Sequence, residues 1–454
     1  MAYTSINPAN GEILQEFPLW SAAELDAALT AVASAVIPWQ SVGLEERCAL
    51  MRRAAEVLRV RRDELARLIT LEMGKLFKEA QGEIEKSAWV CEHYADNASE
   101  LLADELIESD AGRSLVAYQP LGTVLAVMPW NFPFWQVFRF AAPALVAGNT
   151  GVLKHASNVP QCALAIESVF REAGFPDGVF RTLLISASQV KGVIEDPRIH
   201  AVTLTGSEPA GRQVAAAAGG ALKKSVLELG GSDAFIVLED ADLELAVQQA
   251  VASRYLNCGQ SCIAAKRFIV VDAVAEAFLQ RFKAAVEELL PGDPLDENAT
   301  LAPMARGDLR EALHRQVQQS VAQGAVLVAG GYSLDRDGAF YAATILDHVQ
   351  PGQPAYHEEL FGPVAIVIRA RDEADALRIA NDSDFGLGSS VWTRDSARGE
   401  MLARQVQAGC CFVNGMVKSD PRLPFGGVRH SGYGRELSHH GIHEFLNIKT
   451  IWIR

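Results

Sequence analysis

The sequence predicts an α/β protein with two parallel-sheet domains, and three observations support that fold class. The chain has 454 residues, which is too long for one compact core and suits two or three domains that share an interface. Hydrophobic residues make up 49% of it, enough to build a large buried core. From Thr123 onward, short apolar runs alternate with amphipathic stretches, which is the pattern of strands joined by crossover helices.

The segment before Thr123 is expected to be mainly helical. Ser21 and Glu24 form a capping box that opens an amphipathic helix with Leu29 and Val32 on one face. A long helical region is expected to follow and to run to about residue 107.

Two series of strands are expected after that region, one for each sheet. The closing residues 447–454 alternate as an edge strand would, and an apolar strand at a chain end invites pairing with another subunit. The expected strands cover residues 124–127, 151–153, 179–184 and 201–205 in the first series, and 235–237, 267–271, 364–368 and 411–413 in the second, with helices near 241–255, 274–290 and 306–323.

Charge and composition exclude several classes of function. The net charge of -15 and the pI near 5.2 argue against nucleic acid or an anionic membrane as the main partner, because both are polyanions. The uncharged run Leu121–Phe138 contains Pro129, Asn131 and Pro133, which indicates a buried strand followed by a turn rather than a membrane span. The chain opens on no secretory leader and has seven scattered cysteines, so we expect a cytoplasmic protein with reduced thiols.

Two segments predict chemistry. Asn257–Cys262 offers a nucleophilic thiol, and Glu228, which lies between Leu227 and Leu229, offers a base. A thiol reacts only as thiolate, so its surroundings must favour ionisation through a helix start or a nearby cation. Apolar neighbours should raise the pKa of the Glu228 carboxyl by desolvation, which suits a group that takes a proton from water.

Seven segments, in chain order, resemble those of the aldehyde dehydrogenase superfamily, most closely its succinate-semialdehyde dehydrogenases. The resemblance implies an aldehyde dehydrogenase-like α/β fold with a Rossmann-type cofactor domain (1–101 and 121–229, with a return segment at 426–444). It also implies an α/β catalytic domain (230–425), an oligomerisation arm (102–120 and 445–454), and a homodimer or homotetramer. The segments are Pro129–Pro133, Leu153–Lys154, Thr205–Ser207 with Gly211, Leu227–Gly231, Gly259–Cys262, Glu359–Pro363 and Pro424–Gly427.

The resemblance implies a role for each matching residue. Cys262 would be the nucleophile, Asn131 with the Cys262 backbone N–H the oxyanion hole, and Glu228 the base that activates water. The alternatives are a buried structural thiol, a turn residue before proline, and an ion pair of Glu228 with Lys223 or Lys224. The residues implied to bind NAD or NADP are Trp130, Lys154, Ser157, Gly206, Ser207, Gly211, Leu229, Glu359 and Phe361.

Ser157 decides which nicotinamide we expect. Many NAD-preferring relatives carry a glutamate three residues after the lysine, where it binds ribose hydroxyls and repels a 2'-phosphate. Serine at this position leaves space and a donor. We therefore expect NADP to be accepted, with NAD also used.

Arg139 is expected to bind the far carboxylate of the substrate, because relatives specific for succinate semialdehyde carry an arginine here. The alternative is a structural salt bridge of Arg139 to an acidic residue. A second arginine found in some of these enzymes is replaced by Leu256, so specificity could extend to glutarate semialdehyde or uncharged aldehydes. The expected substitutes for it are Arg254, Lys418 and Ser419.

Other readings of the cysteines remain open. Cys258 lies four residues before Cys262, but no second pair with metal-ligand spacing accompanies it, so no metal is expected. A reversible disulfide between the two would be a redox switch. A cysteine hydrolase and a non-catalytic scaffold are the alternatives of another class, and aldehyde-dependent reduction of NAD or NADP would separate them from a dehydrogenase.

Overall fold

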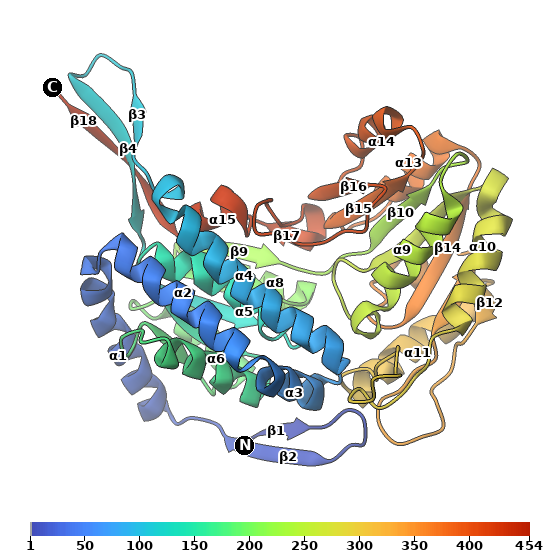
Figure 1. Cartoon of the computed structure of the whole chain (residues 1–454), viewed down its shortest axis with the longest axis horizontal. Coiled ribbons are helices and arrows are strands. Elements are labelled where there is room, and N and C mark those ends of the chain that lie inside the picture. The colour runs from blue at the N-terminus through green and yellow to red at the C-terminus, as the bar shows by residue number, and fades with distance from the viewer. Residues whose placement is uncertain (1) are drawn as a thin grey trace.

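The computed structural model describes residues 2–454 and places them in two sheet-centred halves joined side by side (Figure 1). The N-terminal half contains a six-stranded sheet of order β17-β9-β8-β5-β6-β7, parallel except where β17 pairs with β9. Its strands are β5 (Thr123–Met128), β6 (Thr150–His155), β7 (Phe180–Thr182), β8 (Ala201–Thr205), β9 (Lys224–Glu228) and β17 (Gly432–Tyr433).

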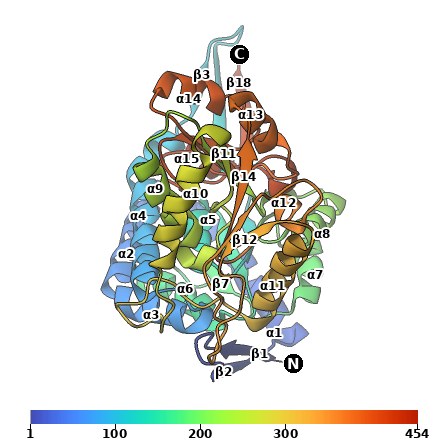
Figure 2. The same ribbon diagram turned by 90° about the vertical axis from the view of Figure 1, so that its right-hand side faces the viewer.

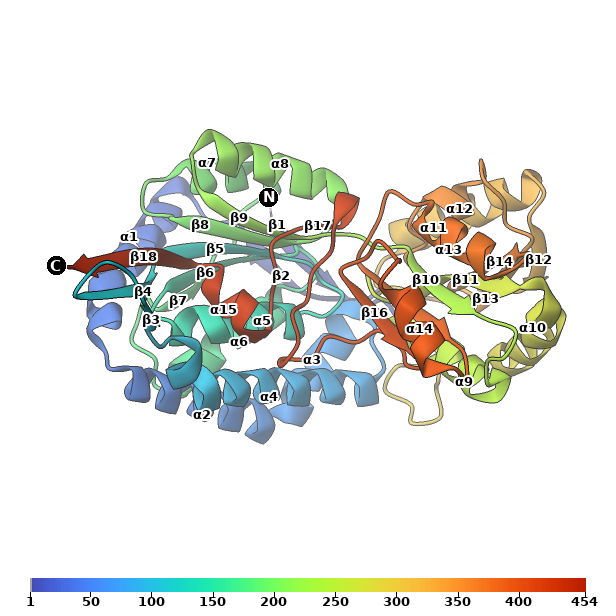
Figure 3. The same ribbon diagram turned by 90° about the horizontal axis from the view of Figure 1, so that it is seen from above.

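Helices cover both faces of this sheet (Figure 3). Successive residues of β5 point to opposite faces, so Val124 joins the core under α2–α6 while Leu125 joins the core under α1, α7 and α8. The helices are α1 (Ala22–Ser41), α2 (Leu44–Val60), α3 (Arg62–Met73), α4 (Phe77–Leu101), α5 (Trp135–Val146), α6 (Pro160–Glu172), α7 (Val190–Glu195) and α8 (Glu208–Gly220).

Helix α1 begins where the sequence predicts, because the capping box of Ser21 and Glu24 is present. By length and composition alone this helix could cross a membrane, which is weak support for a span because a core helix passes the same test. Its residues Leu29 and Val32 are buried against the sheet. The helix therefore has a packing role within the fold.

The C-terminal half contains a seven-stranded sheet of order β12-β13-β14-β11-β10-β15-β16, parallel except for β12 with β13. Helices α9 and α10 lie on one side of it and α11 and α12 on the other (Figure 2). Its elements are β10 (Asp233–Val237), α9 (Leu243–Tyr255), β11 (Ala265–Val271), α10 (Asp272–Glu287), α11 (Gly307–Ala322), β12 (Val326–Ala329), β13 (Thr344–Asp347), α12 (Pro354–His357), β14 (Val364–Ala370), α13 (Glu373–Asn381), β15 (Gly388–Trp392), α14 (Ser396–Ala403) and β16 (Cys410–Val413).

Two small antiparallel sheets complete the fold. The hairpin of β1 (Ala2–Ile6) and β2 (Ile13–Pro18) lies under the N-terminal half, and a three-stranded sheet projects from it (Figure 1). In the projecting sheet the C-terminal strand β18 pairs only with β4, so its other edge is free and it is an edge strand, as the sequence predicts. That sheet has the order β18 (Leu446–Ile453), β4 (Arg113–Pro120), β3 (Glu105–Ile107), and α15 (Ser438–His443) precedes it.

The predicted strands of both series are present, but two predictions differ from the structure. The segment 179–184 forms only the three-residue strand β7. The helical region expected up to residue 107 is wrong, because it consists of α2, α3 and α4 and ends at Leu101, and residues 105–107 are strand β3. Gly74, at a φ of 81°, ends α3 in a left-handed conformation that favours glycine, and this turn separates α3 from α4.

Candidate active site

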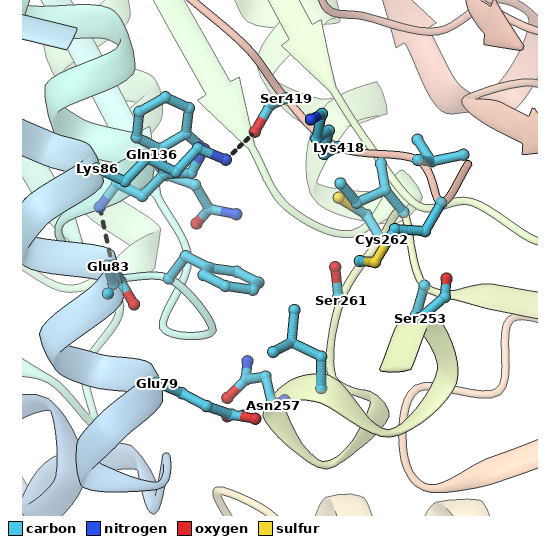
Figure 4. Close-up of a pocket in the computed structure, with 18 of the residues that line it drawn as sticks. Glu79, Glu83, Lys86, Gln136, Ser253, Asn257, Ser261, Cys262, Lys418 and Ser419 are labelled. Atoms are coloured by element: carbon cyan, nitrogen blue, oxygen red, sulfur yellow. Dashed lines mark hydrogen bonds between the residues drawn. The ribbon is translucent and has the colours of Figure 1, made fainter. Parts of the chain in front are cut away.

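The candidate nucleophile opens onto a cavity of about 310 Å³ between the two halves. Cys262, Trp135 and Phe425 are among the residues that line it (Figure 4). The cavity draws residues from α4 and α5 of one half and from the loop before β11 of the other. Its size is at the lower end of the range for small-molecule sites, about 300 to 1,000 Å³.

The loop that carries Cys262 is held by buried hydrogen bonds. Arg254 donates to the carbonyl oxygens of Gly259, Gly362 and Ala265, at 2.9 Å for Gly362 and 3.2 Å for Ala265. Gly259 has a φ of 70°, and a Cβ there would overlap the Gly362 carbonyl. Arg254 is fully buried, both of its terminal nitrogens donate to backbone, and it does not line the cavity, so the expectation that it substitutes for a substrate-binding arginine is wrong.

Burial dominates the electrostatics of Cys262. It raises the pKa of the thiol to about 12, although the positive charges of Lys266 and Arg139 act in the opposite direction. Lys266 donates to the carbonyls of Ser261 and Cys262 at 2.9 and 2.8 Å. The nearby cations expected from the sequence are present, but they do not outweigh desolvation, so a proton must be removed before the sulfur can react.

Asn131 is tied to the Cys262 loop. Its side-chain Nδ2 donates to the Gln260 carbonyl at 3.0 Å, and its Oδ1 accepts from Gln136 at 3.2 Å. Its own carbonyl accepts from Lys75 at 2.9 Å and from the Asn257 side chain at 2.8 Å. These bonds hold the Asn131 side chain against the loop that carries Cys262.

Glu228 is the last residue of β9, and it does not form the ion pair with Lys223 or Lys224 that the sequence left as an alternative. Lys224 pairs instead with Glu444 at 2.9 Å, and Lys223 donates to backbone carbonyls. Among the described residues neither Glu228 oxygen has a hydrogen-bond partner. Burial raises the pKa of the Glu228 carboxyl well above its ordinary value, and the neighbouring Glu436 carboxylate acts in the same direction, so the predicted shift is confirmed.

The glycine pair after Glu228 lets this segment pass directly against the Cys262 loop. A Cβ on Gly231 would lie 2.7 Å from the Cys262 carbonyl oxygen, so only glycine fits. The Gly231 N–H donates to Glu359 at 3.0 Å, which also pairs with Lys266 at 3.3 Å. The candidate base and the candidate nucleophile thus lie on contacting segments.

The residues expected to bind the dinucleotide lie around the carboxyl ends of β6, β8 and β9. Gly206 and Ser207 follow β8, and Ser207 is the N-cap of α8, whose first N–H groups suit a phosphate. Gly211 contacts Leu229, where a Cβ would lie 2.6 Å from the leucine side chain. Trp130, from the first half, meets Phe361, from the second, edge-on at 5.8 Å between ring centroids.

Lys154 and Ser157 lie at the adenosine end of the expected dinucleotide site. Burial lowers the pKa of Lys154, whose ammonium pairs with no carboxylate of residues 2–454 and lies 5.8 Å from the Tyr3 ring centroid. Ser157 is exposed and borders a separate hollow of about 610 Å³ together with Arg306. The buried ammonium of Lys154 and the exposed hydroxyl of Ser157, three residues apart in the chain, are groups of the kind that a ribose and a phosphate bind.

Arg139 lines the cavity but is already paired. Its guanidinium forms an ion pair with Glu436, and both side chains are buried. It also lies 4.6 Å from the Phe425 ring centroid and contacts the Thr205 hydroxyl at 3.4 Å. The salt bridge that the sequence left as an alternative is therefore present.

The comparisons with known proteins decide the family. The profile of the aldehyde dehydrogenase family matches residues 1–451. The chain belongs to that family. It is 52% identical, over all of both chains, to a probable NADP(+) succinate-semialdehyde dehydrogenase of Synechocystis sp.. It is 49% identical to a succinate-semialdehyde dehydrogenase of Escherichia coli that is named for both NAD and NADP, over 99% of this chain and 97% of that one.

A solved structure has the same overall fold. Succinic semialdehyde dehydrogenase from Streptococcus pyogenes, in complex with NADP+, has a TM-score of 0.98 to this chain at 40% identity, and each chain covers all of the other. The α/β architecture predicted from the sequence is the architecture of aldehyde dehydrogenases.

The sequence reasoning missed a set of charged residues on α4 and in the turn before it. Lys75 and Glu83 form a buried ion pair, and Glu83 also accepts from the N–H groups of Phe134 and Trp135 at 2.8 and 3.1 Å. Lys86 faces the cavity. The spacing of Glu79, Glu83 and Lys86, at helical intervals on one face of a helix that packs on α5, was the available signal.

Cys258 is buried beside the nucleophile loop at a φ of 53°. Burial raises the pKa of this thiol. Within residues 2–454, no group of three or more His, Cys, Asp or Glu side chains could hold a metal ion.

Proposed function

We propose that this aldehyde dehydrogenase oxidises succinate semialdehyde, or a closely related aldehyde acid, to the dicarboxylate with NADP or NAD. The observation that carries the proposal is that Cys262 lines the cavity while the loop that carries it contacts both Asn131 and Gly231, which follows Glu228. The names of relatives about half identical to this chain support the substrate and the cofactor.

The Cys262 thiol first loses its proton to solvent, and the thiolate then adds to the aldehyde carbon. The resulting oxyanion accepts hydrogen bonds from the Asn131 side chain and the Cys262 backbone N–H, and one such donor contributes roughly 3 to 4 kcal/mol. Bound NADP or NAD supplies the acceptor for the hydride that leaves the same carbon. Cys262 then carries a thioester.

Glu228 completes the turnover. It takes a proton from a water molecule, the hydroxide adds to the thioester carbon, the carbon–sulfur bond breaks to release the acid, and the sulfur takes the proton from Glu228 to become a thiol again. A carboxyl with a raised pKa suits this task, because it holds the proton firmly enough to take it from water.

Lys154 and Ser157 would hold the adenosine ribose and its 2'-phosphate, and Gly206, Ser207, Gly211 and Leu229 would shape the pyrophosphate site. Glu359 would hold the nicotinamide ribose, and Trp130 and Phe361 would flank the ring. At the substrate end we propose Lys418 and Ser419, which line the cavity. Arg139, also expected there, lines the cavity too, but its guanidinium is engaged by Glu436.

The deciding experiment measures kcat/KM for succinate semialdehyde, glutarate semialdehyde and butanal, each with NADP and with NAD. We expect the four-carbon acid with NADP to be the best pair. A broad preference is the second candidate, because Leu256 lines the cavity where some relatives have arginine. A preference for NAD above about a hundredfold in kcat/KM would contradict the cofactor assignment. If no aldehyde produced NADPH or NADH, the protein would not be a dehydrogenase, and a cysteine hydrolase or a non-catalytic scaffold would remain as the alternatives.

We also propose the division into a cofactor domain (1–101, 121–229 and 426–444), a catalytic domain (230–425) and an arm (102–120 and 445–454). The exposed side chains of Ile448 and Trp452 on the free edge of β18 support pairing with a second copy in a cytoplasmic homodimer or homotetramer. Sedimentation analysis of the full chain, with Ile448→Lys as a variant that should dissociate, tests the assembly.

A further inference from the structure

Two lysines line the cavity without an ion pair among residues 2–454, the half-buried Lys86 and the exposed Lys418. Lys75 is neutralised by Glu83 and Arg139 by Glu436, and all four of these side chains are at most 5% exposed. Lys86 projects from α4, and its ammonium donates to the Ser419 hydroxyl at 2.8 Å. Within residues 2–454 no carboxylate forms an ion pair with it.

The surroundings of Lys86 suit a carboxylate ligand. Its ammonium lies 4.2 Å from the Trp135 ring centroid, and the cavity wall there is largely apolar, with Phe132 and Phe425. A low-dielectric wall strengthens a charge-assisted hydrogen bond. Figure 4 shows Lys86, Ser419 and Lys418 bordering the same space as Cys262, so a ligand can reach the ammonium and the sulfur together.

Arg139 is less suited to the same task. Turning its guanidinium to a ligand would leave Glu436 buried without its partner, next to the Glu228 carboxyl that Glu436 already affects. The ion pair of Arg139 with Glu436 therefore holds in place the carboxylate that acts on Glu228, the candidate base.

We propose that Lys86, with the Ser419 hydroxyl beside it, binds the far carboxylate of the aldehyde acid and so sets the preference of this enzyme for charged over uncharged aldehydes. The inference rests on the proposed function and adds the residue that recognises the substrate's charge. Arg139 then serves as a positioning residue for Glu436.

The ionisation of Lys86 agrees with this role. Burial, followed by the charge of Arg139, lowers the pKa of Lys86 to about 8, so the ammonium form prevails at neutral pH. The charged groups that influence it are Arg139, Glu83, Asp420 and Lys418.

The test uses Lys86→Met, which keeps the length of the side chain and removes the charge, with Lys86→Arg as the charge-retaining control. We expect kcat/KM for succinate semialdehyde to fall about 30- to 100-fold in Lys86→Met, through KM, as loss of a charged hydrogen bond predicts. With butanal we expect a change of less than about twofold. Lys86→Arg should keep most of the preference for the acid.

A second readout works without turnover of the acid. Butyrate should inhibit butanal oxidation competitively in the natural protein and about 30-fold more weakly in Lys86→Met. An unchanged KM and unchanged butyrate inhibition in Lys86→Met would overturn the inference. A natural protein that oxidises butanal with no inhibition by butyrate would overturn it as well, and one that oxidises no aldehyde would refute the proposed function instead.

Equal losses with both aldehydes in Lys86→Met would also count against the inference, provided that its melting temperature and NADP binding match those of the natural protein. If they do not match, Lys86→Gln replaces it, and the ratio of the two aldehydes decides in the same way.

Discussion

The buried pair of Lys75 and Glu83 should be a main source of stability for the loop that carries Asn131. The Lys75 side chain is 1% exposed and that of Glu83 2%. Lys75 also donates to the Asn131 carbonyl, and Glu83 receives two N–H groups at the start of α5. Removing either partner leaves the other as an uncompensated charge in the interior.

The expected cost of Glu83→Ala follows from that burial. Breaking a buried ion pair typically costs about 3 to 5 kcal/mol, far more than the 0 to 1 kcal/mol of an exposed pair. The double variant Lys75→Met with Glu83→Met removes both charges and should be destabilised less than the sum of the single variants Lys75→Met and Glu83→Met by at least about 2 kcal/mol.

Urea unfolding followed by tryptophan fluorescence and circular dichroism measures these free energies. Lys78→Met, which changes an exposed lysine of the same helix, is the matched control and should shift the free energy of unfolding by less than about 0.5 kcal/mol. The reasoning fails if Glu83→Ala costs under about 1 kcal/mol, or if the single losses simply add in the double variant.

Three further outcomes are expected. The ratio of kcat/KM for succinate semialdehyde to kcat/KM for butanal should fall about tenfold between pH 7 and 9, because Lys86, with a pKa of about 8, is charged below that pH and neutral above it. Taking the ratio cancels the titration of Cys262 and Glu228, which affects both aldehydes. A ratio that does not change with pH would contradict the role of Lys86. Glu228→Gln should retain a first-turnover burst of NADPH in stopped flow, while steady-state turnover falls about 10² to 10⁴-fold; loss of the burst itself would remove Glu228 from the hydrolytic step. Ser157→Glu should lower kcat/KM for NADP about a hundredfold relative to NAD, since a carboxylate repels the 2'-phosphate, and an unchanged ratio of the two cofactors would exclude this position from cofactor choice.

Local patterns in the sequence were sufficient to predict the strands of the two large sheets. Strands such as β5 and β11 are buried on both faces, so they read as apolar runs, and the capping box at Ser21 gives the start of α1. The boundary at Gly74 was missed because three helices in succession carry the same apolar period as one long helix.

The charge pairing of the site could not be read in this way. Glu436 lies far from Arg139 along the chain, and only the fold brings them together. The sequence allowed a salt bridge for Arg139 without identifying its partner. Lys86 was overlooked although it follows Glu83 on the same helix face, because a charged stripe on a helix usually faces solvent.

The short connection between the two large sheets restricts how this protein can be divided. β9 ends at Glu228 and β10 begins at Asp233, so four residues separate a strand of one sheet from a strand of the other. Glu228, the proposed water-activating carboxyl, and Cys262, the proposed nucleophile, consequently belong to different halves that touch at this link. A chimera that exchanges one half for that of a relative would pair Glu228 or Cys262 with a partner segment from another protein. Single substitutions are therefore a safer way to change the cofactor preference than exchange of a whole half.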